Sequence, residues 1–373
     1  MIKTQEIPLV DLRIQHAQIE EEVNVGIAGV LRHQGFILGP EVRAFETEFA
    51  RYSGVGHVLG VGNGTDALEL ALRAVGIGRG DEVIVPANTF VATAEAVLRT
   101  GADIVLVDND ENYLIDVEHV GERLTRKTRA IMGVHLYGQT APVERLREIA
   151  GPDVVIIEDA AQSQGARRHG IRAGSLGDIA GTSFYPGKNL GAYGDAGAVM
   201  TNSPEYAEAV AQLRNHGGQK RYEHNLVGMN SRMDSIQAVV LSAKLAHLDR
   251  WNTQRREAAA YYAHLFADDV RFVTPCVAEG NEHVFHLYVV RVPRAARNGV
   301  VEWMSRNGVG VGIHYPAPIH RLGAFQQLSD QGSFPLAEKF GEEILSLPIF
   351  PGITREQQDH VVEMLIAALR ECA

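Results

Sequence analysis

The chain has 373 residues, a formal net charge of −11 at pH 7 and a sequence pI near 5.8. This acidic balance argues against a nucleic-acid partner, because binding to the phosphate backbone depends on clustered Lys and Arg. Hydrophobic residues make up 45% of the sequence, which is enough for a large core. The length predicts one large domain and a smaller one.

The cysteines and the N-terminal sequence indicate the cellular compartment of the protein. Cys276 and Cys372 lie far apart and belong to no CxxC or Cys/His cluster. We therefore expect no disulfide framework, no metal site and a reducing compartment. The chain lacks the basic stretch and apolar core of a signal peptide, and no apolar run approaches the roughly 18 residues of a membrane span. The sequence predicts a cytoplasmic protein with no membrane partner.

Short apolar runs alternate with helical patterns between about residues 60 and 202. The runs 82–85, 104–107, 130–134 and 154–157 are continuously apolar, which is typical of strands covered on both faces. Segments between them, such as 66–75, show the three- and four-residue apolar spacing of amphipathic helices. The strict alternation predicts a mainly parallel α/β sheet.

The pattern changes after residue 202. It predicts a helix near 204–214, a polar and basic loop, and a long helix that starts near Met233 and reaches Trp251. Two strand-like runs, 284–292 and 309–313, follow between helices. We predict a large domain over residues 1–250, with the packing of its N-terminal segment left open, and a small α+β domain over residues 251–373.

Two segments at predicted strand ends suit a flat, phosphorylated ligand. The glycine-rich segment 62–66 opens a helix, where free N–H groups and the helix dipole favour an anion, and Thr65 adds a hydroxyl. An ordinary capped turn has the same pattern, so both interpretations stay open. Phe90 follows the strand 82–85 and could lie flat on a planar cofactor. Taken alone, that segment favours a core phenylalanine.

Two acids follow the apolar run 154–157 directly. An unpaired buried carboxylate is costly, and a protonated pyridine nitrogen is a suitable partner for one. We assign Asp159 to such a nitrogen, where it would preserve the ring as an electron sink. Glu158 receives no role and is expected to face solvent or a neighbouring helix.

The segment 182–197 contains a single lysine, Lys188, between glycines and a proline. A lysine that forms a Schiff base needs a rigid loop, because it must reach the cofactor aldehyde and later carry protons. Most loop lysines only improve solubility, but the surroundings of Lys188 fix its position. Lys188 must be neutral to accept a proton, so we expect its pKa below the reference value of about 10.4.

Taken together, these segments resemble the DegT/DnrJ/EryC1/StrS family of pyridoxal-phosphate (PLP) dependent sugar aminotransferases. The resemblance spans nearly the whole chain, from 62–68 through 159–162 and 183–191 to 346–348. It implies fold type I of the aspartate aminotransferase superfamily. In that fold a large, mainly parallel α/β/α domain carries a smaller α+β C-terminal domain.

The resemblance also implies a role for individual residues. Lys188 would bind pyridoxal 5′-phosphate as a Schiff base, and Asp159 would pair with the ring nitrogen. Phe90 would stack on the ring and Gln162 would hydrogen-bond the phenolic oxygen. The phosphate contacts are expected from Gly64, Thr65 and Ser183. Asn230 is expected to reach the phosphate in the opposite subunit of a twofold homodimer with shared active sites.

The implied substrates are an amino acid donor, expected to be L-glutamate, and a keto sugar carried on a nucleotide diphosphate. The donor converts the cofactor to pyridoxamine phosphate, which then aminates the sugar. The charges of the loop 216–225 suit a diphosphate, although a solvated basic loop is an equal alternative. The expected sugar-nucleotide contacts are Tyr185, Lys220, Tyr222, Arg250 and Tyr315.

The run 230–238 resembles the branch of the family that acts on 3-keto-6-deoxyhexoses. The 4-keto branch more often has Tyr in place of Ser231 and Thr in place of Asp234. We therefore predict conversion of a dTDP-3-keto-6-deoxyhexose to a dTDP-3-amino-3,6-dideoxyhexose. The main alternative is C4 amination of a dTDP-, GDP- or UDP-linked 4-keto-6-deoxyhexose.

Three other classes fit less well. A non-catalytic PLP-binding regulator has no need of the intact set Lys188, Asp159 and Gln162. A cysteine desulfurase needs an activated cysteine, and Cys276 has no basic neighbour in the sequence. An NAD-dependent oxidoreductase would carry GxGxxG after its first strand, which the chain lacks.

Overall fold

A computed structural model describes residues 6–220 and 222–372. Its centre is a seven-stranded sheet with the strand order β1-β9-β8-β5-β4-β2-β3. The strands are β1 (His57–Val61), β2 (Glu82–Pro86), β3 (Asp103–Val107), β4 (Thr128–Val134), β5 (Val155–Asp159), β8 (Ile179–Ser183) and β9 (Gly197–Thr201). Neighbouring strands from β3 to β8 pair in parallel, whereas β9 pairs antiparallel with both β8 and β1. The predicted mainly parallel sheet is confirmed.

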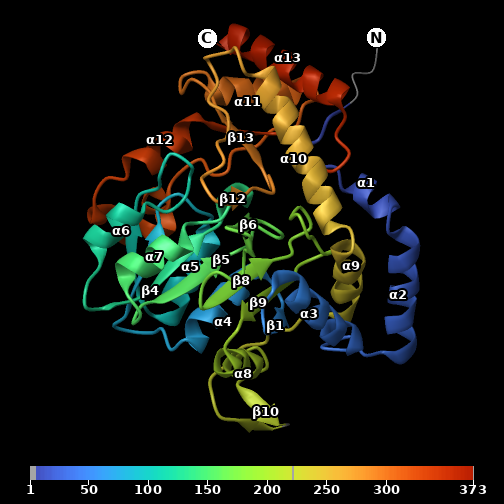
Figure 1. Cartoon of the computed structure of the whole chain (residues 1–373), viewed down its shortest axis with the longest axis vertical. Coiled ribbons are helices and arrows are strands. Elements are labelled where there is room, and N and C mark those ends of the chain that lie inside the picture. The colour runs from blue at the N-terminus through green and yellow to red at the C-terminus, as the bar shows by residue number, and fades with distance from the viewer. Residues whose placement is uncertain (1–5, 221, 373) are drawn as a thin grey trace.

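Helices pack on both faces of this sheet and make a three-layer domain (Figure 1). One face is covered by α4 (Gly64–Ala74), α5 (Val91–Thr100) and α8 (Pro204–Leu213). The other face is covered by α3 (Pro40–Ser53), α6 (Val117–Arg123), α7 (Val143–Ala150) and α9 (Ser235–Leu245). Because both faces are covered, the central strands are almost fully buried, which explains their continuously apolar sequence.

The C-terminal part has a core of its own. The long helices α10 (Leu248–Leu265), α11 (Arg297–Arg306) and α13 (Arg355–Cys372) enclose the antiparallel pair β13 (Tyr288–Arg291) and β14 (Ile344–Leu347). These three helices lie together at the top of Figure 1.

The predicted strand 309–313 is wrong. The segment makes only isolated bridges, from Val309 to Ile7 and from Gly312 to Ser346. Glycines weaken a strand and let another backbone come close, and a Cβ at Gly310 would meet the backbone of Leu9 at 2.8 Å.

The long helix predicted from Met233 to Trp251 is two helices. The N–H of His247 bonds to the carbonyl of Lys244 at 3.0 Å, a tighter turn that ends α9 before α10 begins. Neither Pro nor Gly marks this break, so the sequence pattern runs through it. The predicted apolar stripe is nevertheless buried on both sides of the break, at Leu241 and Trp251 for example.

Three segments cross the predicted domain boundary at residue 250. Ile7 bridges to Val309, and β12 (Asn281–Glu282) pairs with β6 (Arg167–Arg168), which also pairs with β7 (Ile171–Arg172). Residues 319–337 add apolar side chains to the core beside β2 and β3. The division into 1–250 and 251–373 stays a prediction.

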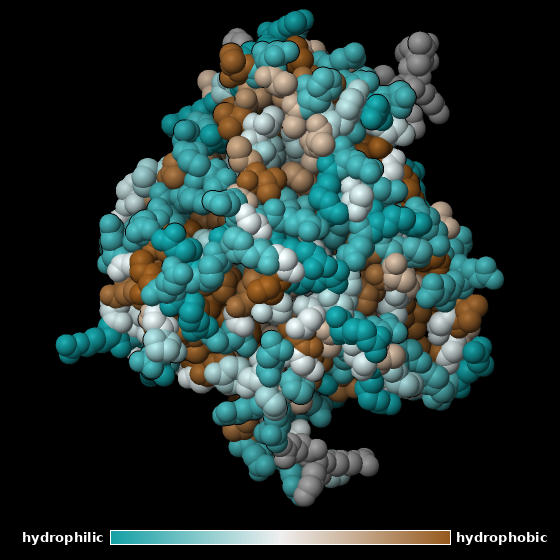
Figure 2. Space-filling view, in the orientation of Figure 1, coloured by the Kyte–Doolittle hydropathy of each residue, from teal (hydrophilic) through white to brown (hydrophobic). Residues whose placement is uncertain are grey.

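The remaining elements complete the described structure. They are α1 (Leu12–Ala17), α2 (Glu20–His33), α12 (Pro335–Glu343), β10 (Gly218–Lys220), β11 (Glu223–His224) and 3₁₀ turns at Leu136–Gly138, Ile319–Arg321 and Gly323–Gln331. The hairpin that contains β10 projects from the body beyond α8 (Figure 1). The face drawn in Figure 2 is mainly hydrophilic, with small apolar groups scattered over it. No helix in the described ranges is long and apolar enough to cross a membrane.

Candidate active site

A cavity of about 700 Å³ lies at the carboxyl ends of the central strands. Ligands bind at this edge in open α/β sheets, and the volume is within the range of small-molecule sites. The N-termini of α4 and α5, the ends of β5 and β8, and residues of the C-terminal part all contribute to its wall. The predicted site residues on its wall are Gly64, Thr65, Phe90, Asp159, Gln162, Ser183, Tyr185, Lys188 and Tyr315.

The N-terminus of α4 faces the cavity and is built to receive an anion. Asn63 caps the helix by accepting the N–H of Asp66 at 2.8 Å. The first N–H groups of the helix, at Gly64 and Thr65, have no partner within it. A Cβ at Gly64 would lie 2.6 Å from the Cβ of Ser183, so glycine allows the helix to approach the end of β8. Backbone donors, two hydroxyls and the helix dipole thus fit a phosphate.

Asp159 ends β5 and is only 6% exposed. Its carboxylate accepts the hydroxyl of Thr93 at 2.8 Å and the N–H of Ala161 at 3.2 Å. Burial raises the pKa of Asp159, while these hydrogen bonds and the charge of Lys188 act in the opposite direction. A protonated ring nitrogen would supply a closer positive charge, so the carboxylate fits a pyridinium ring.

Lys188 lies in the loop that joins β8 to β9, and hydrogen bonds fix this loop. The N–H of Lys188 bonds to the carbonyl of Tyr185 at 2.8 Å, and the ammonium of Lys244 donates to the carbonyl of Gly191 at 2.6 Å. Burial lowers the pKa of Lys188 to about 8, although the negative charge of Asp159 opposes the shift. The lowered pKa agrees with the prediction and makes a neutral amine accessible near physiological pH.

Aromatic and amide groups complete a slot for a planar ring. Phe90 is 49% exposed and lies 5.2 Å from Tyr315 between ring centroids, so the core interpretation of Phe90 is wrong. Gln162 accepts the N–H of Tyr137 at 2.7 Å and donates to the hydroxyl of Tyr315 at 3.1 Å. An amide has two N–H donors, so one remains for an oxygen on the ring.

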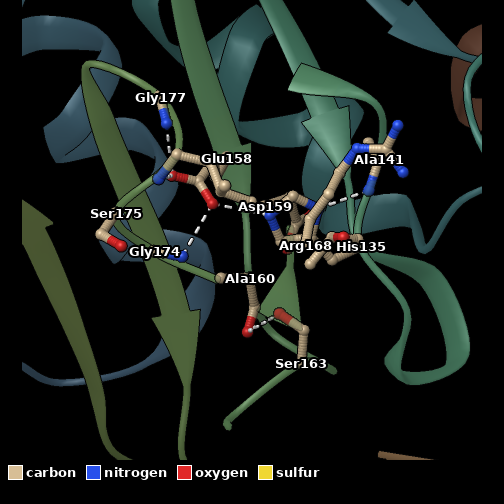
Figure 3. Close-up of polar contacts among 12 residues, drawn as sticks. His135, Ala141, Glu158, Asp159, Ala160, Ser163, Arg168, Gly174, Ser175 and Gly177 are labelled. Atoms are coloured by element: carbon tan, nitrogen blue, oxygen red, sulfur yellow. Dashed lines mark hydrogen bonds and ion pairs between the residues drawn. The ribbon is translucent and has the colours of Figure 1, made fainter. Parts of the chain in front are cut away.

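The sequence suggested that Glu158 faces solvent or a neighbouring helix, but the structure shows neither. The side chain is fully buried and accepts three backbone N–H groups of the turn 174–177 at 2.7–2.8 Å (Figure 3). It also bonds to Nε2 of His135 at 2.7 Å. Nδ1 of His135 accepts the N–H of Ala141 at 3.0 Å, so the ring proton sits on Nε2 and is donated to Glu158. Glu158 therefore fixes a histidine that lines the cavity.

Four predicted contacts are absent from the cavity wall of the single chain. Asn230 is exposed and forms a bridge with Asn215. Arg250 is on the outer surface of α10, where it donates to Gln18 at 2.6 Å. Tyr222 is 80% exposed beyond β10. The backbone of Lys220 is in β10, and its side chain falls outside the described part of the structure.

The structure adds site residues that received no role from the sequence. Thr93 bonds to Asp159, and His135, His286 and His314 line the cavity. His135 follows a predicted strand directly, which was a usable signal. His286 and His314 come from the C-terminal part and meet the sheet only in three dimensions.

Two related sequences cover nearly all of the chain. A pleiotropic regulatory protein of Geobacillus stearothermophilus is 44% identical over 98% of this chain and 100% of its own length. The dTDP-3-amino-3,6-dideoxy-α-D-galactopyranose transaminase of Aneurinibacillus thermoaerophilus is 46% identical over 96% of this chain and 98% of its own length.

Solved structures show the same fold. DesV of S. venezuelae, in complex with a ketimine intermediate, is 42% identical with a TM-score of 0.94, over 98% of this chain and 99% of DesV. NtdA of Bacillus subtilis, with bound pyridoxamine phosphate as cofactor, is 30% identical with a TM-score of 0.89, over 99% of this chain and 86% of NtdA. The predicted fold, cofactor class and transaminase class are confirmed.

The family model supports the same assignment. The model described as the DegT/DnrJ/EryC1/StrS aminotransferase family matches residues 17–366, almost the whole chain. The site geometry and these relatives agree with the resemblance predicted from the motifs. The chain therefore belongs to the DegT/DnrJ/EryC1/StrS aminotransferase family and is a transaminase.

Proposed function

We propose that this protein transfers the amino group of L-glutamate to the C3 keto group of a dTDP-linked 6-deoxyhexose, with PLP as cofactor. The observation that carries the proposal is the placement of Lys188 and Asp159, both on the wall of one cavity that also holds the anion-binding end of α4. This combination fits a phosphorylated pyridine ring that reacts with an amine.

Each group of the cavity has a task in this reaction. Bound PLP supplies an electron sink for the charge that develops at the donor α-carbon. Asp159 would hold a proton on the ring nitrogen. Nζ of Lys188 would accept the proton from the donor α-carbon and carry it across the site. Gln162 would orient the ring through its second amide N–H, and Phe90 would cover one face.

The choice of C3 rests on the relatives and on the positions that separate the two branches. The Aneurinibacillus relative is named for a dTDP-3-amino sugar. In this chain Ser231 is buried, and its hydroxyl accepts the N–H of Gly62 at 3.0 Å. Ser231 is therefore joined to the segment that leads into the anion site, where a tyrosine of the C4 branch would need a different arrangement. C4 amination remains the alternative.

The proposal includes a cytoplasmic homodimer. Asn230 is exposed and lies outside the cavity of its own chain, as expected of a residue that serves the opposite subunit. Tyr222 is 80% exposed, and the hairpin that contains β10 projects away from the body (Figure 1), which suits contacts to the nucleotide part of a substrate bound in a neighbouring subunit.

The first experiment is an absorbance spectrum of the purified protein with PLP, before and after addition of L-glutamate. We expect a visible band of the lysine-bound cofactor that disappears with glutamate. The Lys188→Ala variant should not show this conversion. A wild-type protein with no band in the presence of PLP would refute the transaminase assignment and favour the non-catalytic regulator.

A second experiment identifies the sugar and the carbon. The glutamate-treated enzyme is mixed with dTDP-3-keto-6-deoxyglucose or with its 4-keto isomer, and the product is characterised by mass spectrometry and NMR. An amine at C3 supports the proposal. Turnover of the 4-keto sugar alone, with the amine at C4, would replace it by the alternative.

A further inference from the structure

His286 comes from the C-terminal part of the chain, two residues before β13. Its side chain lines the same cavity as Lys188 and is 8% exposed. Its Nδ1 lies 3.1 Å from Oδ1 of Asn189, the residue next to Lys188. The sequence assigned this histidine no role, and the reaction derived above does not use it.

The hydrogen bonds around His286 fix the position of its ring proton. Nδ2 of Asn189 donates to the carbonyl of Val284 at 3.1 Å and to Oδ1 of Asn252 at 2.8 Å, and Nδ2 of Asn252 donates to the carbonyl of Gln164 at 2.9 Å. Main-chain carbonyls only accept, so the orientation of both amides is determined. Oδ1 of Asn189 is therefore an acceptor, Nδ1 of His286 carries the proton, and Nε2 has a lone pair.

The charges around the ring keep it neutral. Burial lowers the pKa of His286 well below its usual value, and Lys188, Arg255, His314 and His283 add to the effect. Arg255 on α10 is buried and donates to the main-chain carbonyl of His286 at 3.4 Å. Because none of these neighbours is acidic, none of them would stabilise a second proton on the ring.

We propose that Nε2 of His286 is the acceptor that holds the amino group of Lys188 while that group is free of the cofactor. When Lys188 removes the α-proton of the donor, the C–H electron pair passes to the cofactor and the proton binds the lone pair of Nζ. The resulting ammonium donates one N–H to Nε2 of His286 and a second one back toward the cofactor. A neutral imidazole can accept this bond, whereas an imidazolium would repel the ammonium. This inference rests on the proposed function.

The position of the ring proton can be measured without cofactor or substrate. In cofactor-free protein labelled with ¹⁵N-histidine, NMR should show His286 as a neutral ring with the proton on Nδ1. His283 is an internal control, since its Nδ1 accepts the N–H of Phe285 at 2.8 Å and its proton must sit on Nε2. The variants H286Q and H283Q assign the two signals. A proton on Nε2 of His286, or a ring that titrates near pH 7, would overturn the inference.

Kinetics then test the acceptor itself. In a single turnover with L-glutamate, H286F should slow the proton transfer about 10- to 100-fold, because it removes one hydrogen bond from the ammonium. H286Q offers an amide oxygen and should recover much of the rate. H283Q, a change at a buried histidine that is absent from the cavity wall, should keep the wild-type rate.

The pH profile separates an acceptor from a packing residue. Loss of the acceptor destabilises the ammonium, which lowers the pKa of the released Lys188, so the acidic limb of the H286F profile should move to lower pH. A wild-type rate or an unmoved limb in H286F would contradict the role of His286. Neither result would affect the proposed function, which is tested separately by the reaction of the wild-type protein with glutamate and by the sugar carbon that receives the amine.

Discussion

The two walls of the cavity present different kinds of groups. The wall built on the sheet carries Asp159, Lys188 and the anion-binding end of α4. The wall from the C-terminal part carries His286, His314 and Tyr315. Burial and the charge of Lys188 lower the pKa of His314 to about 4, so this wall is uncharged at neutral pH. Charge is thus concentrated on the sheet side, and the opposite side supplies shape and the direction of hydrogen bonds.

The supports behind the walls differ in the same way. Behind the sheet wall, the buried carboxylate of Glu158 fixes His135 and the turn 174–177 (Figure 3). Behind the other wall, Arg255 is buried and donates to main-chain carbonyls, including that of Ile349 at 3.0 Å. Burial lowers the pKa of Arg255 to about 10, so the guanidinium stays charged at neutral pH. An anion therefore supports one wall and a cation supports the other.

We expect the largest effect on turnover from loss of the negative charge of Asp159 on the sheet wall. Asp159→Asn keeps the shape of the side chain but cannot hold a proton on the ring nitrogen by charge. We expect turnover to fall about 10²- to 10³-fold, with little change in thermal stability. The measurement is a single-turnover rate with L-glutamate, beside a melting curve. Wild-type turnover in this variant would show that the charge on the sheet wall is dispensable.

A change at Glu158, which supports the sheet wall, should lower the stability of the protein. Glu158→Gln removes a buried charge and places an amide N–H₂ against backbone donors of the turn 174–177. We expect the free energy of unfolding to fall by about 3 kcal/mol, as measured by denaturant titration. Glu302→Gln is a matched control on the surface, where Glu302 and Arg306 are 69% and 79% exposed in their side chains. That change should cost less than about 0.5 kcal/mol, and equal losses in the two variants would contradict the assigned role of Glu158.

The charge of the sheet wall should also appear in a pH profile. Covalent capture of PLP by cofactor-free protein needs the neutral amine of Lys188, whose pKa is lowered to about 8. The capture rate should be constant well above pH 8 and fall about tenfold for each pH unit below it. Stopped-flow absorbance measures this rate. A limb near the reference pKa of about 10.4 would mean that burial does not act on Lys188 as the structure indicates.

We expect the smallest effect on the kinetics from a change at Tyr315 on the opposite wall. Tyr315→Phe removes a hydroxyl that accepts one N–H of Gln162 at 3.1 Å, on a residue that lines the cavity and is expected to contact the sugar. We expect KM for the keto sugar to rise about 2- to 10-fold with kcat nearly unchanged, since one neutral hydrogen bond is lost. Steady-state kinetics decide between this outcome and a fall in kcat, which would move Tyr315 into the chemistry.

The sheet wall could be predicted from the sequence because its residues are local in sequence to strand ends. Asp159 follows a continuously apolar run, and the segment 62–66 precedes a helical pattern, so the sequence identifies the element beside each of them. The opposite wall could not be predicted in this way. His286 and His314 reach the cavity through contacts between segments more than 100 residues from Asp159, and no local pattern encodes them.

Neighbouring positions can also have opposite environments that a pattern does not separate. Glu158 and Asp159 are adjacent acids at the end of one strand, yet side chains of consecutive strand residues point to opposite faces. Asp159 faces the cavity, while Glu158 meets the turn 174–177, whose backbone donors have no signature in the sequence. The break between α9 and α10 was also missed, because neither Pro nor Gly marks it in the sequence.

The segment from Ile7 to Val10 brings part of the N-terminal region to the wall of the reaction chamber. Leu9 and Val10 line the cavity, and Ile7 is held by the isolated bridge to Val309. A deletion through Val10 would therefore remove part of the chamber wall while it leaves every strand of the sheet intact. Preparations that lack this segment should therefore be compared with the full chain before substrate preferences are assigned.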